Sequence, residues 1–248
     1  MRRNRAVVLL AAFLSLFAAD ASAQLQKVQQ AVDPADEPFH SLILENDFVR
    51  VFRVEIPRFK RTELYRHDRD FVMIALAQGE ASFARPNSMA LTRQFDQGYT
   101  QFVPGGFSHT VANADSVRTL RLLEVELKRG SVKPAVVYDY STAVARLYDT
   151  IPLPVNPRAT YAVSHEAESV IGTDQQILPG ESTPMHKHRG PHLVIALTDF
   201  ELENQPEGGE ARSISVAAGE VRWVEALGFH RLKNVGKEPG RFISVEMK

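Results

Sequence analysis

The chain has 248 residues, of which 44% are hydrophobic and 24% are charged, with a formal net charge of -1. This composition is typical of a folded protein and argues against a fibrous or wholly disordered chain. No basic stripe with interleaved aromatic residues is present, which argues against nucleic acid as a partner. Because the sequence contains no cysteine, neither disulfide stabilisation nor thiol chemistry is open to it, and histidine remains as the ligand for a transition metal.

The first 23 residues predict a secretory signal peptide. Arg2, Arg3 and Arg5 precede an apolar run over 6–19, and an Ala-Ser-Ala sequence ends at Ala23. The apolar run of about 14 residues is shorter than the roughly 20 that a membrane-spanning helix needs. We therefore expect cleavage after Ala23, a mature chain without membrane contact, and a periplasmic or secreted location.

The rest of the chain divides into four parts. Residues 24–39 are polar, contain two prolines and predict a flexible N-terminal segment. Residues 40–129 carry short β-branched and aromatic runs separated by turn residues, the pattern of an all-β sandwich or barrel. Residues 130–160 contain four prolines around a short helical stretch and predict a linker. The strand pattern returns over 161–248.

The two strand-rich parts repeat one another. A single shift of 121 residues places four residues of the first part on identical residues of the second, namely His67 on His188, His109 on His230, Gly98 on Gly219 and Asn113 on Asn234. Four coincidences under one shift indicate a duplication. We predict two copies of one barrel, each of about 90 residues, which is small enough for mutual packing to matter for stability.

The second copy resembles both sequence motifs of the cupin family. Four residues match the first motif, with histidine in last place where the family usually has glutamate: Gly180, His186, His188 and His192. The second motif keeps Gly219, His230 and Asn234 but has Glu225 and Leu227 in place of proline and glycine. The resemblance covers residues 40–248. It implies an all-β bicupin, with two tandem cupin jelly-roll barrels joined by a Pro-rich linker that contains a short helix.

The first copy shows the opposite pattern. Its second motif is complete, at Gly98, Pro104, Gly106, His109 and Asn113. Its first motif retains only His67, with Tyr65 and Phe71 at the outer ligand positions. Two imidazoles make a poor metal site unless a carboxylate such as Asp70 or Glu63 joins them. We therefore expect a degenerate site in the first barrel and one metal per chain.

The second copy predicts a site of four histidines, His186, His188, His192 and His230. Alternate residues of a strand share a face, so the imidazoles of His186 and His188 should point the same way. Gly190 and Pro191 permit a bend before His192, and a barrel can bring the later strand at His230 across from the first. Neutral imidazole suits Fe, Cu, Ni and Zn, and the resemblance adds Mn, so the expected cofactor is one divalent transition metal ion. The alternative is a surface loop that happens to be rich in histidine.

The resemblance implies a metal-dependent enzyme, and an oxygenase or oxidase acting on a small organic substrate is the leading hypothesis. Glu225 is the candidate catalytic residue, as a general base whose pKa desolvation would raise. Two alternatives stay open. One is a non-redox lyase, isomerase or decarboxylase acting on sugar acids or other carboxylates. The other is a non-catalytic cupin that binds a small ligand around a structural metal. Pairing of chains into a homodimer is also left open.

Overall fold

The computed structural model describes residues 30–128, 159–225 and 228–248. Within these ranges the regular elements are β-strands, apart from a short 3-10 helix, η1, at Pro34–Asp36. No helix in the described ranges combines the length and the hydropathy needed to cross a membrane. The predicted signal peptide and the predicted linker helix lie outside the described residues.

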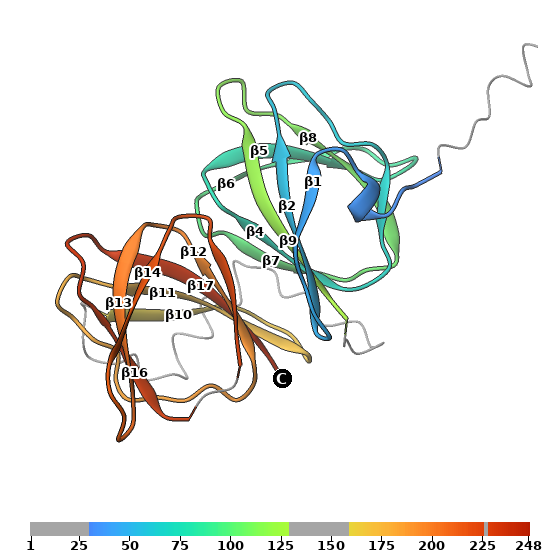
Figure 1. The fold of residues 1–248 in the computed structure, drawn as a ribbon. Helices are drawn as coiled ribbons and strands as arrows, with labels where there is room; N and C mark the ends of the chain where they lie inside the picture. Colours follow the sequence, from blue (N-terminus) through green and yellow to red (C-terminus); the bar gives the residue numbers. More distant parts are fainter. Residues whose placement is uncertain (1–29, 129–158, 226–227) are drawn as a thin grey trace, which may run out of the picture. The chain divides into compact units, whose positions relative to one another are not determined.

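Nine strands form the first barrel, hereafter barrel 1 (Figure 1). They are β1 (His40–Glu45), β2 (Val49–Ile56), β3 (Tyr65–His67), β4 (Phe71–Ala75), β5 (Gly79–Ala84), β6 (Leu91–Phe95), β7 (Thr100–Val103), β8 (Phe107–Asn113) and β9 (Leu120–Leu127). A five-stranded sheet has the order β1-β2-β9-β4-β7, and a four-stranded sheet has the order β3-β8-β5-β6. Neighbouring strands pair antiparallel, as in a jelly roll.

Eight strands form the second barrel, hereafter barrel 2 (Figure 1). They are β10 (Ala159–Glu166), β11 (Val170–Ile177), β12 (His192–Ala196), β13 (Phe200–Pro206), β14 (Arg212–Val216), β15 (Val221–Val224), β16 (His230–Asn234) and β17 (Gly240–Met247). The five-stranded sheet β10-β11-β17-β12-β15 repeats the order of its counterpart in barrel 1, and β14-β13-β16 form the second sheet. The all-β tandem architecture predicted from the sequence is confirmed.

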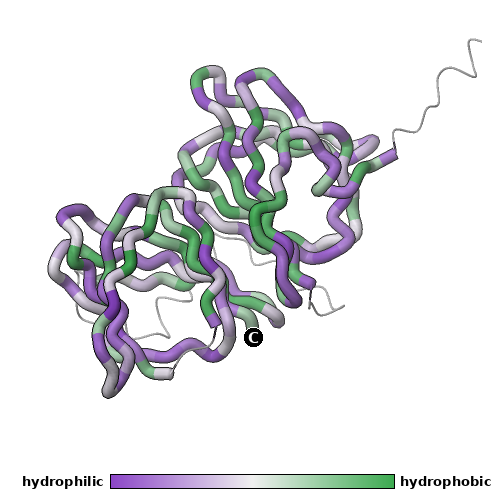
Figure 2. Tube along the Cα trace, in the orientation of Figure 1, coloured by the Kyte–Doolittle hydropathy of each residue, from purple (hydrophilic) through white to green (hydrophobic). Residues whose placement is uncertain are grey.

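Each barrel has its own apolar interior between its two sheets. The interior of barrel 1 contains Phe52, Val54, Ile56, Tyr65, Phe71, Met73, Ala75, Ala81, Phe95, Val111, Leu120 and Leu122. The interior of barrel 2 contains Ile177, Ala196, Phe200, Leu202, Val216 and Phe242. Hydrophobic and hydrophilic residues are interspersed along the same strands (Figure 2), as expected when alternate side chains face opposite sides of a sheet.

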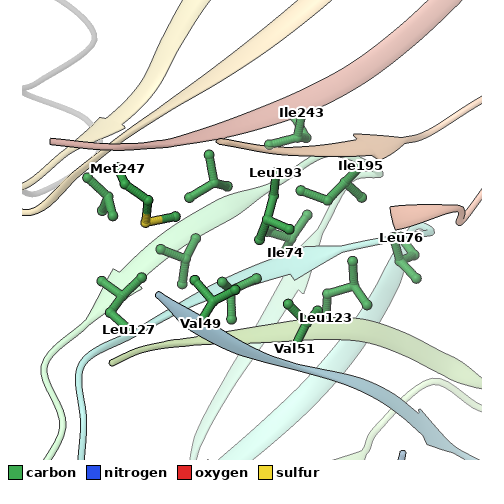
Figure 3. Packing of buried hydrophobic residues seen from close by; sticks show 14 of the residues in the cluster. Val49, Val51, Ile74, Leu76, Leu123, Leu127, Leu193, Ile195, Ile243 and Met247 are labelled. Atoms are coloured by element: carbon green, nitrogen blue, oxygen red, sulfur yellow. The ribbon is translucent and has the colours of Figure 1, made fainter. Parts of the chain in front are cut away.

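A third apolar cluster draws on the other face of both five-stranded sheets (Figure 3). Residues from β2, β4 and β9 of barrel 1 pack there with residues from β12 and β17 of barrel 2, including Val51, Ile74, Leu123, Leu193 and Ile243. These five side chains are fully buried. The central strands of both sheets are therefore covered on both faces, which explains their nearly continuous hydrophobic runs.

The duplication seen in the sequence is repeated in hydrogen bonds. The side-chain amide of Asn113 donates to the carbonyl oxygens of residues 56 and 118, at 2.9 and 2.8 Å. The amide of Asn234 donates to those of residues 177 and 238, both at 2.8 Å. Gly98 and Gly219 have φ angles of 86° and 80°, a left-handed conformation that favours glycine. These residues of the two motifs thus shape turns and strand ends in both copies.

The N-terminal segment differs from its prediction where the structure describes it. We expected flexibility over 24–39, but η1 begins at Pro34, and Glu37 is 2% exposed. The Glu37 carboxylate accepts hydrogen bonds from the backbone N–H groups of Phe39 and Glu63, at 2.7 and 3.1 Å. The polar composition was misleading because one of the three acidic residues of this stretch, Glu37, lies inside barrel 1, while Asp33 and Asp36 are exposed.

Candidate metal site

Three of the four histidines predicted as ligands gather in barrel 2. Ligand atoms of His186, His188 and His230 lie within 4.8 Å of one another. The ring centroids are 4.5 Å apart for His186 and His230, 5.3 Å for His186 and His188, and 5.4 Å for His188 and His230. At this spacing three imidazole nitrogens can converge on a single ion.

The chain brings these residues together through one bridge and one loop. His230 opens β16 and pairs antiparallel with His186, with two backbone hydrogen bonds of 2.8 Å. We expected a strand over His186 and His188, but the structure has only this bridge followed by a loop. A Cβ at Gly190 would lie 2.2 Å from the carbonyl oxygen of Met247. The loop that leads from His188 to β12 therefore requires glycine at this position.

Each of the three imidazoles is held by an acceptor on its Nδ1 atom. Nδ1 of His186 donates to the carbonyl oxygen of Pro184 at 2.9 Å. Nδ1 of His188 donates to Oε2 of Glu246 at 3.0 Å, and Nδ1 of His230 donates to Oδ1 of Asn204 at 2.9 Å. Because carbonyl and carboxylate oxygens accept, the proton lies on Nδ1 and the lone pair on Nε2. This is the tautomer that binds a metal through Nε2, and such outer partners typically orient metal-binding histidines.

Burial favours the neutral form of His230 and His186. It lowers the pKa of His230 to about 4, and the neighbouring His186 and His188 add to the effect. Burial likewise lowers the pKa of His186 below its ordinary value. Nε2 of His230 is buried and has no hydrogen-bond partner among the described residues. A divalent ion would satisfy that nitrogen, so the donor set fits a transition metal.

His192, the fourth predicted ligand, is placed differently. It opens β12, and its nitrogen atoms are not among those that gather. Its ring stacks on His188, with centroids 3.8 Å apart and an interplanar angle of 25°. In barrel 1 Phe71 stacks on His67 in the same way, at 3.9 Å and 23°. Since phenylalanine cannot coordinate a metal, the shared geometry is one of ring packing. A ligand role for His192 stays a prediction.

Glu225, the candidate general base, is exposed and accepts a hydrogen bond of 2.7 Å from the indole N–H of Trp223. The desolvation on which its proposed role depends is absent. Trp223 itself stacks on Phe48 and packs against the shared apolar cluster. Lys187 lies between His186 and His188 in the sequence, and Phe229 precedes His230. The Lys187 ammonium is 5.2 Å from the centroid of the Phe229 ring, and Phe229 is 44% exposed.

Barrel 1 contains a buried network of charged groups that sequence reasoning missed. Glu124, on β9 and 1% exposed, accepts hydrogen bonds from three side chains. These are the Tyr65 hydroxyl at 2.9 Å, Nε2 of His67 at 3.0 Å and Nε2 of His40 at 3.1 Å. Both oxygens of this buried carboxylate are therefore hydrogen-bonded to side chains.

Both histidines of this network lie between two carboxylates. Nδ1 of His67 donates to Glu126 at 2.8 Å, and Nδ1 of His40 donates to Glu37 at 2.6 Å. Burial alone would lower the pKa of each imidazole, but the carboxylates outweigh it and raise the pKa of both to about 9. With both nitrogens donating, His67 and His40 are imidazolium ions at neutral pH.

His67, His109 and Glu124 nevertheless place ligand atoms within 4.8 Å of one another. Burial lowers the pKa of His109 to about 4, and its Nε2 has no hydrogen-bond partner among the described residues. This set differs from the barrel 2 set because both nitrogens of His67 are engaged. Asp70 and Glu63, the carboxylates considered from the sequence, are outside the group, and Asp70 accepts from the backbone N–H of Gly105 at 2.9 Å.

Comparison with known proteins bears on the fold. No family model and no curated protein matches the sequence. Among solved structures, a cupin 2 conserved barrel domain protein from Leptotrichia buccalis is similar, with a TM-score of 0.53 and 14% identity over 88% of this chain and 92% of that one. The structure thus has the cupin fold. At this level of identity the likeness concerns the fold alone.

Two oxalate decarboxylases are also similar in structure. One, from Lactobacillus farciminis in a formate complex, has a TM-score of 0.58 and 12% identity over 89% of this chain and 87% of that one. The other, from Bacillus subtilis, has Mn(II) centers, with a TM-score of 0.55 and 13% identity over 89% of this chain and 78% of that one. An oxalate decarboxylase with Mn(II) centers is therefore among the structural neighbours.

Proposed function

We propose that this protein is a metal-dependent cupin enzyme whose centre is one divalent transition metal ion held in barrel 2 by His186, His188 and His230. The proposal rests on one observation. Each imidazole donates its Nδ1 proton to a protein acceptor, which leaves the three Nε2 atoms for a ligand. Three ligands leave open positions on a metal that takes four to six, as catalytic sites require.

The candidate ions are Fe, Mn, Cu, Ni and Zn, because each accepts imidazole and no thiolate is present. Mn gains support from the Mn(II) centers of the Bacillus subtilis neighbour. Such an ion supplies a positive charge and open positions for a small anionic substrate or dioxygen. The carboxylate of Glu246 holds His188 and accepts from the backbone N–H of Arg189 at 2.6 Å, so it fixes the loop beside the site.

The leading proposal for the reaction is oxidation of a small organic molecule. Glu246 is already engaged by His188 and Arg189, and Glu225 is exposed. Neither is therefore a free, desolvated carboxylate for general acid–base work, which favours chemistry carried by the metal. Decarboxylation of a small carboxylate is the second candidate, and the oxalate decarboxylase neighbours favour it.

The experiment is metal analysis of the native protein followed by two assays. The metal-loaded enzyme is incubated with small carboxylates and phenols while dioxygen uptake and carbon dioxide release are recorded. Uptake supports the oxidase or oxygenase, release without uptake supports the decarboxylase, and the His188→Ala variant serves as the inactive control. Azide should perturb the spectrum of a paramagnetic metal if positions are open. A silent spectrum without turnover would indicate a structural metal.

The proposal includes export, because the first 23 residues have the pattern of a cleavable signal. The protein would then meet its substrate in the periplasm or the medium. Mass analysis of the exported protein should find Gln24 at its amino terminus. Recovery of Met1 on membrane-bound protein would contradict this part of the proposal.

A further inference from the structure

The two barrels hold equivalent histidines in different surroundings. His109 and His230 are both buried, and they lie on the strands that bear the second motif, β8 and β16. In barrel 2, Oδ1 of Asn204 accepts the Nδ1 proton of His230 at 2.9 Å. The position equivalent to Asn204 in barrel 1 is Phe83, whose side chain has no acceptor for His109.

Strand register supports this equivalence. Phe83 of β5 pairs with Val111 of β8, two residues beyond His109. Asn204 of β13 pairs with Leu232 of β16, two residues beyond His230. Asn204 also lies two residues from Leu202, a member of the barrel 2 interior, so its side chain faces the same interior. The amide thus reaches the imidazole from inside the barrel.

The Nδ1 acceptors of His188 and His67 do not distinguish the barrels in this way. Glu246 holds Nδ1 of His188 at 3.0 Å, and Glu126 holds Nδ1 of His67 at 2.8 Å, so this contact is common to both. The acceptor for His186 is a backbone carbonyl. A second difference lies at Ser244 on β17, which is the strand position equivalent to Glu124 on β9. Ser244 pairs with Val194, and Glu124 pairs with Met73. The Ser244 hydroxyl has no hydrogen-bond partner among the described residues.

We propose that Asn204 is a positioning residue for the metal centre, a role that rests on the proposed function. Its amide oxygen holds the Nδ1 proton of His230, so the ring keeps the tautomer and rotation that aim Nε2 toward His186 and His188. Without an acceptor the imidazole is free to carry its proton on Nε2, where it blocks coordination. Asn204 therefore acts through His230 and does not touch the substrate.

The test measures affinity for the metal alone. Co(II) and Zn(II) are titrated against a chelator into wild type, Asn204→Leu, Asn204→Asp and the matched control Gln205→Leu. Gln205 is the neighbouring residue on β13 and accepts from Arg231 on the exposed side, at 2.6 and 2.9 Å. Asn204→Leu should lose about 10- to 100-fold in affinity. Asn204→Asp, which keeps an acceptor, should stay closer to wild type, and Gln205→Leu should match it.

A second measurement needs no metal. Nitrogen NMR of histidine in the metal-free protein should show His230 as the Nδ1–H tautomer in wild type and Gln205→Leu, and a shift toward the Nε2–H tautomer in Asn204→Leu. Equal metal affinity of Asn204→Leu and wild type would overturn the inference. An Nε2–H tautomer of His230 in the wild-type protein would also overturn it, and this second result does not require Asn204→Leu to fold. A wild-type protein that binds no metal would overturn the proposed function itself, which is a different result.

Discussion

The number of nitrogen atoms that the protein already uses decides what each histidine can do. In barrel 2, His186, His188 and His230 each engage Nδ1 and leave Nε2 for a ligand. In barrel 1, His67 and His40 engage both nitrogens with carboxylates. The same side chain thus keeps one nitrogen for a ligand in one setting and is a buried cation in the other.

Replacement of His192 by phenylalanine tests the stacking interpretation. His192→Phe should keep about one metal per chain, because the nitrogen atoms of His192 are not among those that gather and a phenyl ring can stack on His188 as Phe71 stacks on His67. His188→Ala, which removes a gathered donor, should lose the metal and serves as the comparison. Metal content after dialysis is the measurement. Loss of metal from His192→Phe to the same extent would establish the four-histidine set that the sequence predicts.

The gathered histidines could be found from the sequence because their spacing is local or repeated. His186 and His188 are two residues apart, and His188 and His230 repeat the spacing of His67 and His109. Their outer partners carry no such signal. Glu246 is 58 residues from His188, and Asn204 is 26 residues from His230, so only the strand pairing brings them together. The buried role of Glu124 was missed for the same reason.

At the scale of elements, β9 and β17 each contribute side chains both to the interior of their own barrel and to the shared apolar cluster. On β9, Glu124 and Glu126 face the interior of barrel 1, while Leu123 and Val125 belong to the shared cluster. Sequence patterning predicted the strands, since short apolar runs between turn residues are visible without any partner. It gave no indication that acidic residues inside the run "LRLLEVEL" are buried, because a charged residue in a strand is usually solvated.

Removal of the Glu124 charge should destabilise barrel 1. In Glu124→Gln the imidazolium ions of His40 and His67 lose their common counterion, and breaking a buried ion pair typically costs about 3–5 kcal/mol. Glu55→Gln is the control, because Glu55 pairs with Arg121 at the exposed surface of β2, where the cost is about 1 kcal/mol or less. Urea unfolding measures both. Equal losses would show that the network is not a source of stability.

At the scale of the whole molecule, one scaffold is used twice with different buried chemistry. The duplication and the fold class were readable from the sequence, because four identical residues recur under one shift. The difference between the copies was only half readable. The sequence shows that Tyr65 and Phe71 replace the usual motif residues. The burial of the β9 carboxylates inside barrel 1 follows only from the pairing of β9 with β4 in the structure.

The metal-free protein should lose stability as the pH rises. The pKa of His40 and His67 is about 9 in the folded state and near 6.5 when unfolded, so their stabilisation is complete below pH 6.5 and is lost as the pH rises through about 9. The hydroxyl of Tyr65 stays neutral in this window, because burial and then Glu124 raise its pKa well above 10. The free energy of unfolding at pH 7 and pH 10 gives the test.

In Glu124→Gln the alkaline loss should be smaller, because the carboxylate that raises the pKa of both histidines is gone. This variant therefore separates the titration of the network from general alkaline denaturation. A stability profile that is flat between pH 6.5 and pH 9 in the wild-type protein would contradict the assignment of His40 and His67 as buried cations.

The apolar cluster that draws on both five-stranded sheets has a thermodynamic consequence. Because β12 and β17 contribute to it together with β2, β4 and β9, opening either barrel exposes side chains that the other also buries. Cooperativity should then extend across the duplication, and calorimetry should record one transition for the two copies. A metal ion bound by the three histidines would raise the melting temperature of barrel 1 as well, although none of its ligands lies there.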